Sequence, residues 1–291
     1  MAYNRPVEFI PEVWSSLILS RLNSALVYGN VVNRDYEGEI TGFGDVVKIN
    51  EIGPITVNSY SATSTGSLTV QSVSDAQKLL QINQSDYFAF WIDDLDMVQT
   101  KPKLMAEAQK ESGFASANTI DKYIRDMYTQ AGLVAGGTSI TSGADITSTN
   151  VLKYISIAAQ KLDENNVPQQ GRWMIVPPWF HHKLVLAKIV QDTNNSGTLA
   201  NGLIGTGLYG FTFYASNNVK NGTPAGNNAA ILFGYRGSIS LAVQITKIET
   251  ARPSLQGGFK TLVKGLFCFG AKVVRPDTLG VIYADYTAEA T

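Results

Sequence analysis

The strongest hydrophobic pattern in the chain is helical and lies near residue 120. Six apolar side chains recur at the spacing of one face of a 3.6-residue repeat: Ile120, Tyr123, Ile124, Met127, Tyr128 and Ala131. We expect a helix that begins near Thr100 and ends before Gly132, about 30 residues and roughly 45 Å long. Ser112, Gly113 and Ser116 are poor helix formers, so we predict a bend or irregular turn at that point.

An aromatic strand, 87–92, precedes this helix and is followed by an acidic cluster of Asp93, Asp94 and Asp96. Negative side chains offset the positive end of a helix dipole, so the cluster favours a helix start. Carboxylate oxygens of this kind also bind divalent cations, but capping or a salt bridge is the favoured role.

Residues 37–92 read as a long β-excursion with a small, polar, turn-rich tip at 59–67. The strand-like runs are 45–52, 55–57, 68–70 and 79–92. A two-armed hairpin buries little surface by itself. We therefore expect it to lie on another surface, either of its own chain or of a partner. Ahead of it, Pro11 opens a helical pattern that ends at Tyr28. That helix is either an ordinary first helix or an arm that docks on a neighbouring copy.

Alternating helices and short strands over 150–237 predict a compact α/β unit. Its expected elements are a helix over 150–165 capped by Ser148 or Thr149, a strand over 172–176, a helix over 179–190, and strands over 211–215 and 229–234. The Gly/Ser/Thr-rich stretch 132–149 is predicted to be a linker, and 191–210 and 216–228 to be loops. Three closing strands are expected at 238–250, 259–275 and 280–286.

Composition narrows the classes of protein. Of the 291 residues, 44% are hydrophobic, which is enough for a core, and only 16% are charged, against roughly a quarter in typical domains. Low charge with many small polar residues favours a surface covered by partners, although a neutral soluble protein has the same composition. A net charge of −1 gives no basic footprint for tight nucleic-acid binding. No signal peptide and no membrane-spanning run are recognisable.

Three features invite a chemical role, and each has a simpler explanation. Cys268 lies in an apolar run and is interpreted as a small buried hydrophobe, and one cysteine excludes an internal disulfide. The GxGxxG string at 205–210 lacks the strand before it and the helix after it that a dinucleotide site needs, which favours a flexible loop. Adjacent His181 and His182 do not face one metal from a helix. We assign no catalytic, cofactor-binding or metal-ligating residue, and we do not expect an enzyme.

The order of these parts resembles the major capsid protein of tailed phages over nearly the whole chain. The most family-like stretches are 88–110, with its FAFWIDDLD opening, 171–183 (GRWMIVPPWFHHK) and 230–282, which closes on GAKVVRP. The resemblance implies an α+β fold of four parts. They are an N-arm (1–36), an extended E-loop hairpin (37–86) that lies over a neighbouring subunit, a P-domain with a long spine helix and a β-sheet (87–147 and 238–277), and an A-domain with a mixed α/β core (148–237 and 278–291).

The resemblance also implies a function. The chain would be a structural subunit that self-assembles, through hexamers and pentamers, into the icosahedral head shell around double-stranded phage DNA. Implied partners are further copies, a portal and a decoration protein. Because the arm begins directly after Met1, we expect either a separate scaffolding protein or none. Contact with packaged DNA would be weak and non-specific, with no membrane and no cofactor. The protein would reside in the virion after assembly in the bacterial cytoplasm.

Some relatives cross-link a lysine of the E-loop to an asparagine of the P-domain. Here the tip 59–67 has no lysine and no asparagine follows Asn228, so we expect a non-covalent shell. We also expect that deleting 1–36 or 54–67 leaves a folded subunit unable to close shells. The alternatives are an encapsulin-type shell around protein cargo, a small α/β enzyme built on 150–237, and a tail or adhesion protein.

Overall fold

The computed structural model describes residues 26–37, 44–52, 57, 75–93, 103–187, 203–222, 228–251 and 260–288. The principal helices are α2 (Tyr28–Val31), α4 (Lys103–Arg125), α5 (Val151–Glu164) and α6 (Pro178–Leu186). The strands are β1 (Val46–Ile52), β2 (Asp75–Gln81), β3 (Gln84–Asp93), β4 (Leu133–Val134), β5 (Ala144–Ile146), β6 (Arg172–Val176), β7 (Leu203–Leu208), β8 (Phe211–Ala215), β9 (Lys220–Asn221), β10 (Asn228–Tyr235), β11 (Ile239–Ala251), β12 (Lys260–Val273) and β13 (Leu279–Tyr286). Short 3-10 turns follow α4 (Asp126–Gln130), β10 (Arg236–Ser238) and β12 (Pro276–Thr278).

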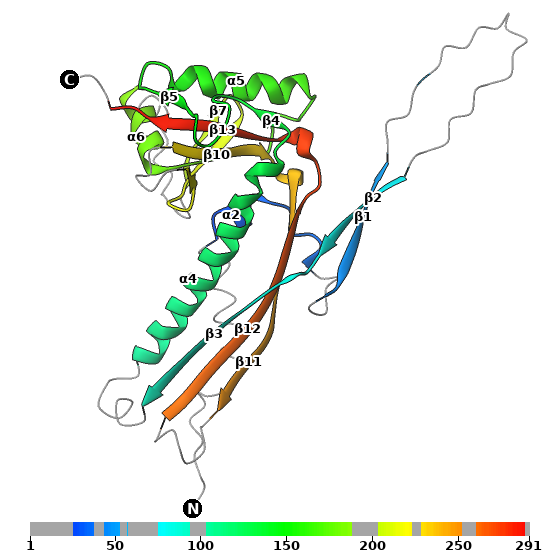
Figure 1. The fold of residues 1–291 in the computed structure, drawn as a ribbon, viewed down its shortest axis with the longest axis vertical. Helices are drawn as coiled ribbons and strands as arrows, with labels where there is room; N and C mark the ends of the chain where they lie inside the picture. Colours follow the sequence, from blue (N-terminus) through cyan, green and yellow to red (C-terminus); the bar gives the residue numbers. More distant parts are fainter. Residues whose placement is uncertain are drawn as a thin grey trace, which may run out of the picture.

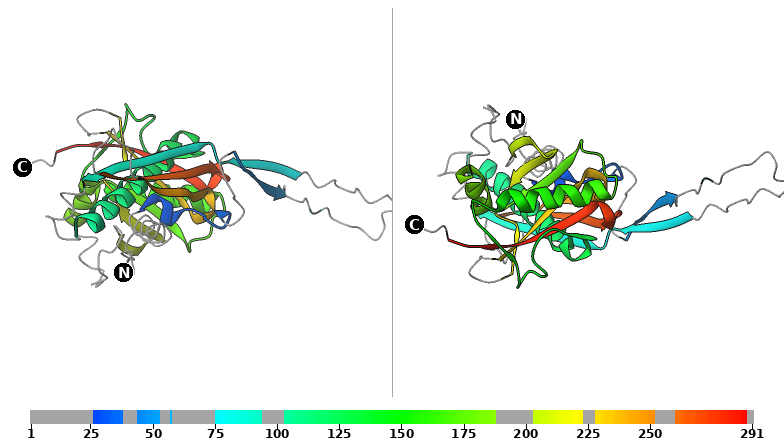
Figure 2. Two further views of the ribbon diagram at one scale, coloured as in Figure 1. Left: turned by 90° about the horizontal axis from the view of Figure 1, so that it is seen from below. Right: turned by 90° about the horizontal axis from the view of Figure 1, so that it is seen from above.

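The described strands form three sheets that divide the molecule into a compact body, a long shaft and a projecting hairpin (Figure 1). The body holds an eight-stranded sheet, in which β4-β13-β10-β6-β8-β7 are neighbours and β5 and β9 pair at its margins. The shaft is the antiparallel sheet β11-β12-β3 with α4 beside it. The hairpin is β1 paired with β2, and both further views show it pointing away from the rest (Figure 2).

The long helix is confirmed, but the α-helix ends at Arg125 and Asp126–Gln130 continue it as a 3-10 turn. Its predicted apolar face is the buried one, with Ile120 and Ile124 fully buried and Met127 nearly so. The predicted bend near residues 112–116 is wrong, because α4 runs unbroken from Lys103 to Arg125. The Ser116 hydroxyl donates to the Ser112 carbonyl at 2.8 Å. Both serines are buried, and this bond satisfies the Ser116 hydroxyl within the helix without breaking it.

The expected single strand over 79–92 is in fact two strands, β2 and β3, separated at Ile82 and Asn83. Among the described strands, β2 pairs with β1 alone, whereas β3 pairs with β12. Buried Ile82 marks the point at which the chain leaves the hairpin and enters the shaft. The two strands share one run of extended sequence, so the break is set by which neighbour each one pairs with.

The predicted loop over 191–210 is wrong for its second half, since 203–208 form β7, antiparallel to β8. Tyr209 and Gly210 connect the two strands with φ of 53° and 78°. Two successive positive φ values match the tight hairpin turn whose twist suits paired strands. The GxGxxG string is therefore part of a β-hairpin and not a flexible loop.

Four smaller expectations also need correction. The linker over 132–149 contains β4 and β5, which pair in parallel with β13. The loop over 216–228 contains β9, paired with β10. The N-cap of α5 is Asn150, not Ser148 or Thr149, and its side chain bonds Thr147 N and Asp145 O. The helix α6 ends at Leu186, and residues 188–190 lie outside the described part.

The remaining elements of the α/β unit and the three closing strands are confirmed within a few residues. The core runs from the body along the inner face of the shaft, and Cys268 is buried as predicted. Several expectations concern residues that lie outside the described part: most of the helix over 11–28, the acidic residues Asp94 and Asp96, the tip 59–67, and the first half of the loop 191–210.

The segment 26–37, which we call the strap, crosses from α4 to β11. Leu26, Tyr28, Val31 and Val32 are buried in the main core. Asn33 pairs with β11 by donating its N–H to Ile239 O at 2.9 Å and accepting that of Leu241 at 2.8 Å. Deleting 1–36 would remove these core side chains, so it would not leave the folded subunit that we expected. A deletion that ends at residue 25 is the matching test.

Candidate functional site

The shaft sheet has one buried face and one partly open face, and β3 shows the division residue by residue. Its exposure alternates with a period of two, as expected for a half-buried strand. Phe88 and Phe90 are partly buried on the inner side, where their rings stack with centroids 6.4 Å apart. Tyr87, Ala89 and Trp91 point outward, and Tyr87 and Trp91 are 75% and 69% exposed.

Strand register places partners from β12 and β11 on the same outward face. Tyr87 is opposite Leu266 and Ala89 is opposite Lys264, while Leu266 and Lys264 are opposite Lys247 and Glu249. Directly opposed residues of antiparallel strands lie on one side of a sheet. We call this surface the outer sheet patch, and its members are Tyr87, Ala89, Trp91, Lys247, Glu249, Lys264 and Leu266. All of these except Trp91, together with Gly265, line a hollow of about 440 Å³.

The charged members of the patch neutralise one another in part. Glu249 accepts ion pairs from Lys247 and from Lys264, the latter at 2.7 Å. The hydrogen bonds from these two lysines hold the pKa of Glu249 down at about 2. The patch therefore offers aromatic and aliphatic surface beside a Lys–Glu–Lys group whose carboxylate stays ionised at any physiological pH. Such a surface suits a protein partner that is itself mostly apolar.

Another part of the same sheet face is covered by the base of the hairpin, which we call its root. A second buried cluster joins the hairpin residues Val47, Ile49 and Leu80 and the linking Ile82 to Ala242, Cys268 and Val274 of the shaft. Gly270 on β12 lies directly under this root, because a Cβ there would be 2.2 Å from Gln81 O. The hairpin's own outer side remains open, with Val46 and Leu79 about 45% exposed.

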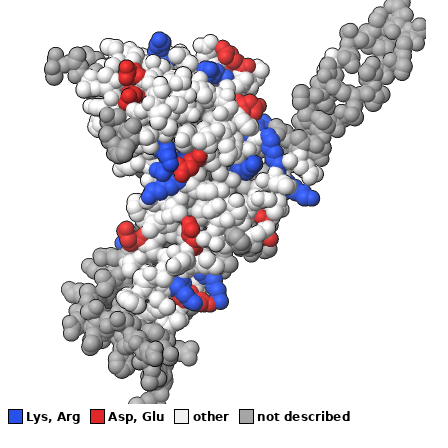
Figure 3. All heavy atoms as spheres, viewed as in Figure 1, with Lys and Arg blue, Asp and Glu red and all other residues white. Residues whose placement is uncertain are grey.

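The charges visible on the face shown in Figure 3 are interspersed, with acidic and basic side chains near one another and broad uncharged areas between them. This view contains no large region of a single sign. Such a surface offers no continuous basic track for a nucleic-acid backbone. Packing of uncharged side chains is the interaction that this face favours.

The features singled out from the sequence do not converge on one site. His181 and His182 lie together on α6 with ring centroids 5.8 Å apart. Burial is the larger cause that lowers the pKa of His181, and the electrostatic effect of His182 lowers it further. Within the described ranges, no three His, Cys, Asp or Glu side chains are arranged to hold a metal ion. No helix in those ranges is long and apolar enough to span a membrane.

The sequence indicated an aromatic strand over 87–92 but not which side of it faces solvent. Both alternating sets are apolar, so periodicity alone does not separate Tyr87 and Trp91 from Phe88 and Phe90. The one available signal was chemical, since tyrosine and tryptophan carry polar groups that suit a surface and phenylalanine does not. The Lys–Glu–Lys group depends on pairing between β11 and β12, which the sequence does not specify residue by residue.

Comparison with known proteins gives a consistent result. A family described as "Phage capsid protein" matches residues 80–284. A solved structure from Mycobacterium phage Che8 is similar at 27% identity and a TM-score of 0.69, covering 97% of this chain and 98% of that one. A capsid structure of the cyanophage P-SCSP1u is similar at 19% identity and a TM-score of 0.67, covering 91% and 89%. A virus-like particle from Pyrococcus furiosus shares the fold at 11% identity and a TM-score of 0.59, covering 94% and 98%. No curated protein matches the chain.

Proposed function

The chain belongs to the phage capsid protein family and is a structural subunit of the head shell, and we propose that it closes this shell by laying its hairpin on the outer sheet patch of a neighbouring copy. The observation that carries the proposal is the patch itself. Two aromatic side chains that are 75% and 69% exposed, next to a hollow of about 440 Å³, form a surface that the described part of the subunit leaves largely exposed.

The projecting hairpin is the complementary part. Its root is fixed to its own shaft by the buried cluster around Leu80 and Cys268. Its described strands then point away from the body (Figure 2). Val46 and Leu79 give its open side an apolar character that matches the patch. Patch and hairpin are different surfaces of one chain, so contact between copies is head-to-tail, and such contacts generate rings and closed shells.

We assign the four parts of the family to the chain as follows: N-arm 1–36, E-loop 37–86, P-domain 87–147 and 238–277, and A-domain 148–237 and 278–291. The P-domain contains α4 and the shaft sheet, and the A-domain contains α5, α6 and most of the eight-stranded sheet. The strands β4 and β5 join that sheet from the P-domain segment. Copies would assemble as hexamers and pentamers in the bacterial cytoplasm, around a separate scaffolding protein and a portal, with a decoration protein outside.

The shell would enclose double-stranded DNA and hold it only weakly. Interspersed charge and a net charge of −1 support this part of the proposal, because tight phosphate contacts would retard DNA release and make it strongly salt-dependent. We assign no catalytic role to the chain. The family and the fold are those of a structural protein.

The size of the proposed contact follows from the exposed aromatics. Covering roughly 100 Å² of apolar surface on each of Tyr87 and Trp91 would contribute about 2.5 kcal/mol per residue. Losing both contributions raises the concentration needed for assembly by at least about a hundredfold, even if only about 3 kcal/mol is realised. Shells depend on many repeats of this contact, so a loss of that size prevents closure at ordinary protein concentration.

Electron microscopy and sedimentation of the purified protein test this function. The wild type is expected to form closed polyhedral shells, or hexamers and pentamers when scaffold is absent. The double variant Tyr87→Ser and Trp91→Ser is expected to fold normally by circular dichroism and to remain unassembled. Phe114→Ser is the matched control, since Phe114 is 56% exposed but lies on α4 outside the patch. Normal shells from the double variant would show that the patch is not the contact surface.

A further inference from the structure

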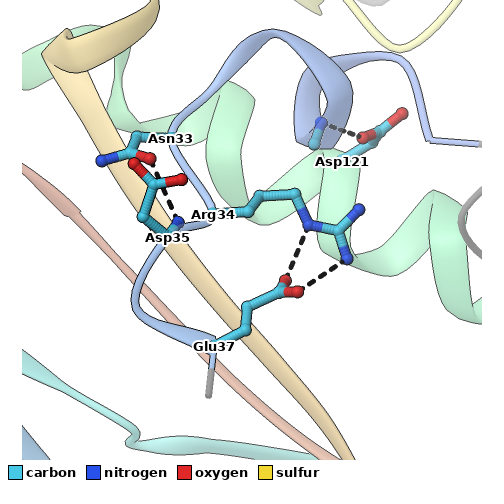
Figure 4. A network of polar contacts seen from close by, with 6 residues as sticks. Asn33, Arg34, Asp35, Glu37 and Asp121 are labelled. Atoms are coloured by element: carbon cyan, nitrogen blue, oxygen red, sulfur yellow. Dashed lines mark hydrogen bonds and ion pairs between the residues drawn. The ribbon is translucent and has the colours of Figure 1, made fainter. Parts of the chain in front are cut away.

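The strap is held at two points by different chemistry. At one end Asn33 exchanges backbone hydrogen bonds with β11. At the other end the carboxylate of Asp121, on α4, accepts the Val27 N–H at 2.9 Å and the Gly29 N–H at 3.2 Å. Figure 4 shows Asp121 pointing from α4 to the strap, apart from the Arg34–Glu37 pair. One end therefore depends on an ionisable side chain and the other does not.

Asp121 is an unusual residue to find in this position. Only 1% of it is exposed, and it lies between the fully buried Ile120 and Ile124 of its own helix and the buried Tyr28 of the strap. A buried carboxylate is costly unless its charge is compensated by hydrogen bonds or a cation. Here the described partners are backbone N–H groups of the strap, and the Tyr28 hydroxyl is buried without a described hydrogen-bond partner.

We propose that Asp121 is a clasp that fixes the strap to the spine helix α4 and releases it more readily in its ionised form than in its protonated form. The geometry supplies the fixing, because the two oxygens bind N–H groups two residues apart at the start of the strap. Burial of the side chain makes the ionised and the protonated forms of Asp121 differ in how readily the clasp opens. When the clasp opens, the carboxylate regains water, and that gain is larger for the charged form than for the neutral one.

The titratable groups around the clasp support this direction. Burial raises the pKa of Asp121 from 3.8 to about 6, against the opposing effect of the hydrogen bonds from the strap. Burial and the nearby Asp121 charge also raise the pKa of Tyr28, while Arg125 lowers it and Asp126 raises it. Arg125 itself pairs with Asp126 and bonds Asn218 O. The interactions that offset the burial of the Asp121 charge are the hydrogen bonds from the strap backbone.

The sign of the pH dependence follows from linkage. A carboxyl whose pKa is higher in the closed state binds its proton more tightly there, so acid favours the closed clasp. This stabilisation of the closed clasp by protonation is complete below about pH 3.8 and is lost as the pH rises through about 6. Between pH 8 and pH 5 the closing equilibrium is expected to strengthen about tenfold. Since residues 1–25 precede the strap, an open clasp would alter where they leave the body.

Hydrogen exchange of the strap amides in the full-length chain tests the clasp directly. Protection of a peptide covering Leu26 to Gly29, corrected for the intrinsic pH dependence of exchange, is expected to be about tenfold greater at pH 5 than at pH 8. Light scattering at each pH checks that the assembly state is the same in the samples compared. Protection that is flat or that rises with pH in the wild type would overturn the proposal.

Two variants separate the clasp from general effects of pH. Asp121→Asn is expected to lower protection at every pH, because its amide nitrogen does not accept the second N–H, and to abolish the slope. Glu111→Gln, at an exposed position on the same helix, is expected to keep the wild-type slope. A slope that persists in Asp121→Asn would refute the assignment. Should that variant not fold, a carbon NMR titration of wild-type Asp121 decides, with a midpoint near 6 expected and one at 3.8 contradicting it.

Discussion

Gly270 provides the most direct test of how the hairpin is held. It lies on β12 under the hairpin root, where a methyl group would be 2.2 Å from the Gln81 carbonyl oxygen and 3.0 Å from its carbon. Ordinary contacts of a Cβ atom begin at 3.4 Å. Gly270→Ala therefore forces the root and the shaft sheet apart by roughly 1 Å, because the opposing atoms are backbone and do not rotate away.

Overpacking of this kind costs about 1–3 kcal/mol. In a chain of this size that corresponds to a fall in Tm of roughly 2–4 °C for each kcal/mol. The loss is concentrated at the cluster of Val47, Leu80 and Cys268, so the hairpin is expected to loosen before the rest unfolds. Urea denaturation measures the free energy of unfolding, and hydrogen exchange of β1 and β2 locates the loss.

Gly237→Ala is the matched control. A methyl group at that position meets only the Tyr235 ring, at 3.4 Å and 3.5 Å, which is ordinary contact. Shell closure is expected to fail for Gly270→Ala and to persist for Gly237→Ala, because only the former redirects the hairpin. If Gly270→Ala unfolds within about 0.5 kcal/mol of the control and still closes shells, the contact at Gly270 does not position the hairpin.

Three further predictions use other parts of the chain. Cys268 is 1% exposed, so a thiol reagent is expected to label it readily only in urea; rapid labelling of the folded chain would contradict the buried hairpin root. The carboxyl of Glu249 is expected to titrate at about pH 2, so its contribution to stability is present above pH 4.5 and is lost as the pH falls through about 2. Lys264→Gln should raise that midpoint, and an NMR titration that finds it unchanged would remove the lysine as a cause. Deletion of residues 1–25 is expected to leave a subunit that still unfolds cooperatively in urea but does not close shells, whereas normal shells in electron microscopy would mean that the arm is dispensable.

The parts of the fold that were predictable are those in which periodicity and burial coincide. The stripe of α5, which includes Val151, Ile155, Ala158 and Leu162, is buried as its spacing indicates. The run Arg172–Val176 forms a strand that is buried throughout. Local pattern is sufficient for such elements because each of them contacts the core along its whole length.

The errors arise where a distant partner decides the local structure. β7 contains two glycines and reads as a loop, yet pairing with β8 across the turn at Tyr209 and Gly210 makes it a strand. The division at Ile82 depends on two different pairing partners for one extended run. Asp121 reads as an ordinary surface residue of an amphipathic helix, and only the position of the strap makes it a buried acceptor.

The open half of the shaft sheet has a physical reason to remain open in a single subunit. One face of one sheet carries both the hairpin root and the outer sheet patch, and the root covers only the residues near Ala242, Cys268 and Gly270. Because the described hairpin strands then run away from the shaft, they leave their own patch uncovered. Exposed aromatic surface of this extent favours burial against another molecule. A hairpin that reaches outward and a patch that its own chain leaves open together favour a contact between successive copies, so each subunit that joins a ring still offers one free hairpin and one free patch until the ring closes.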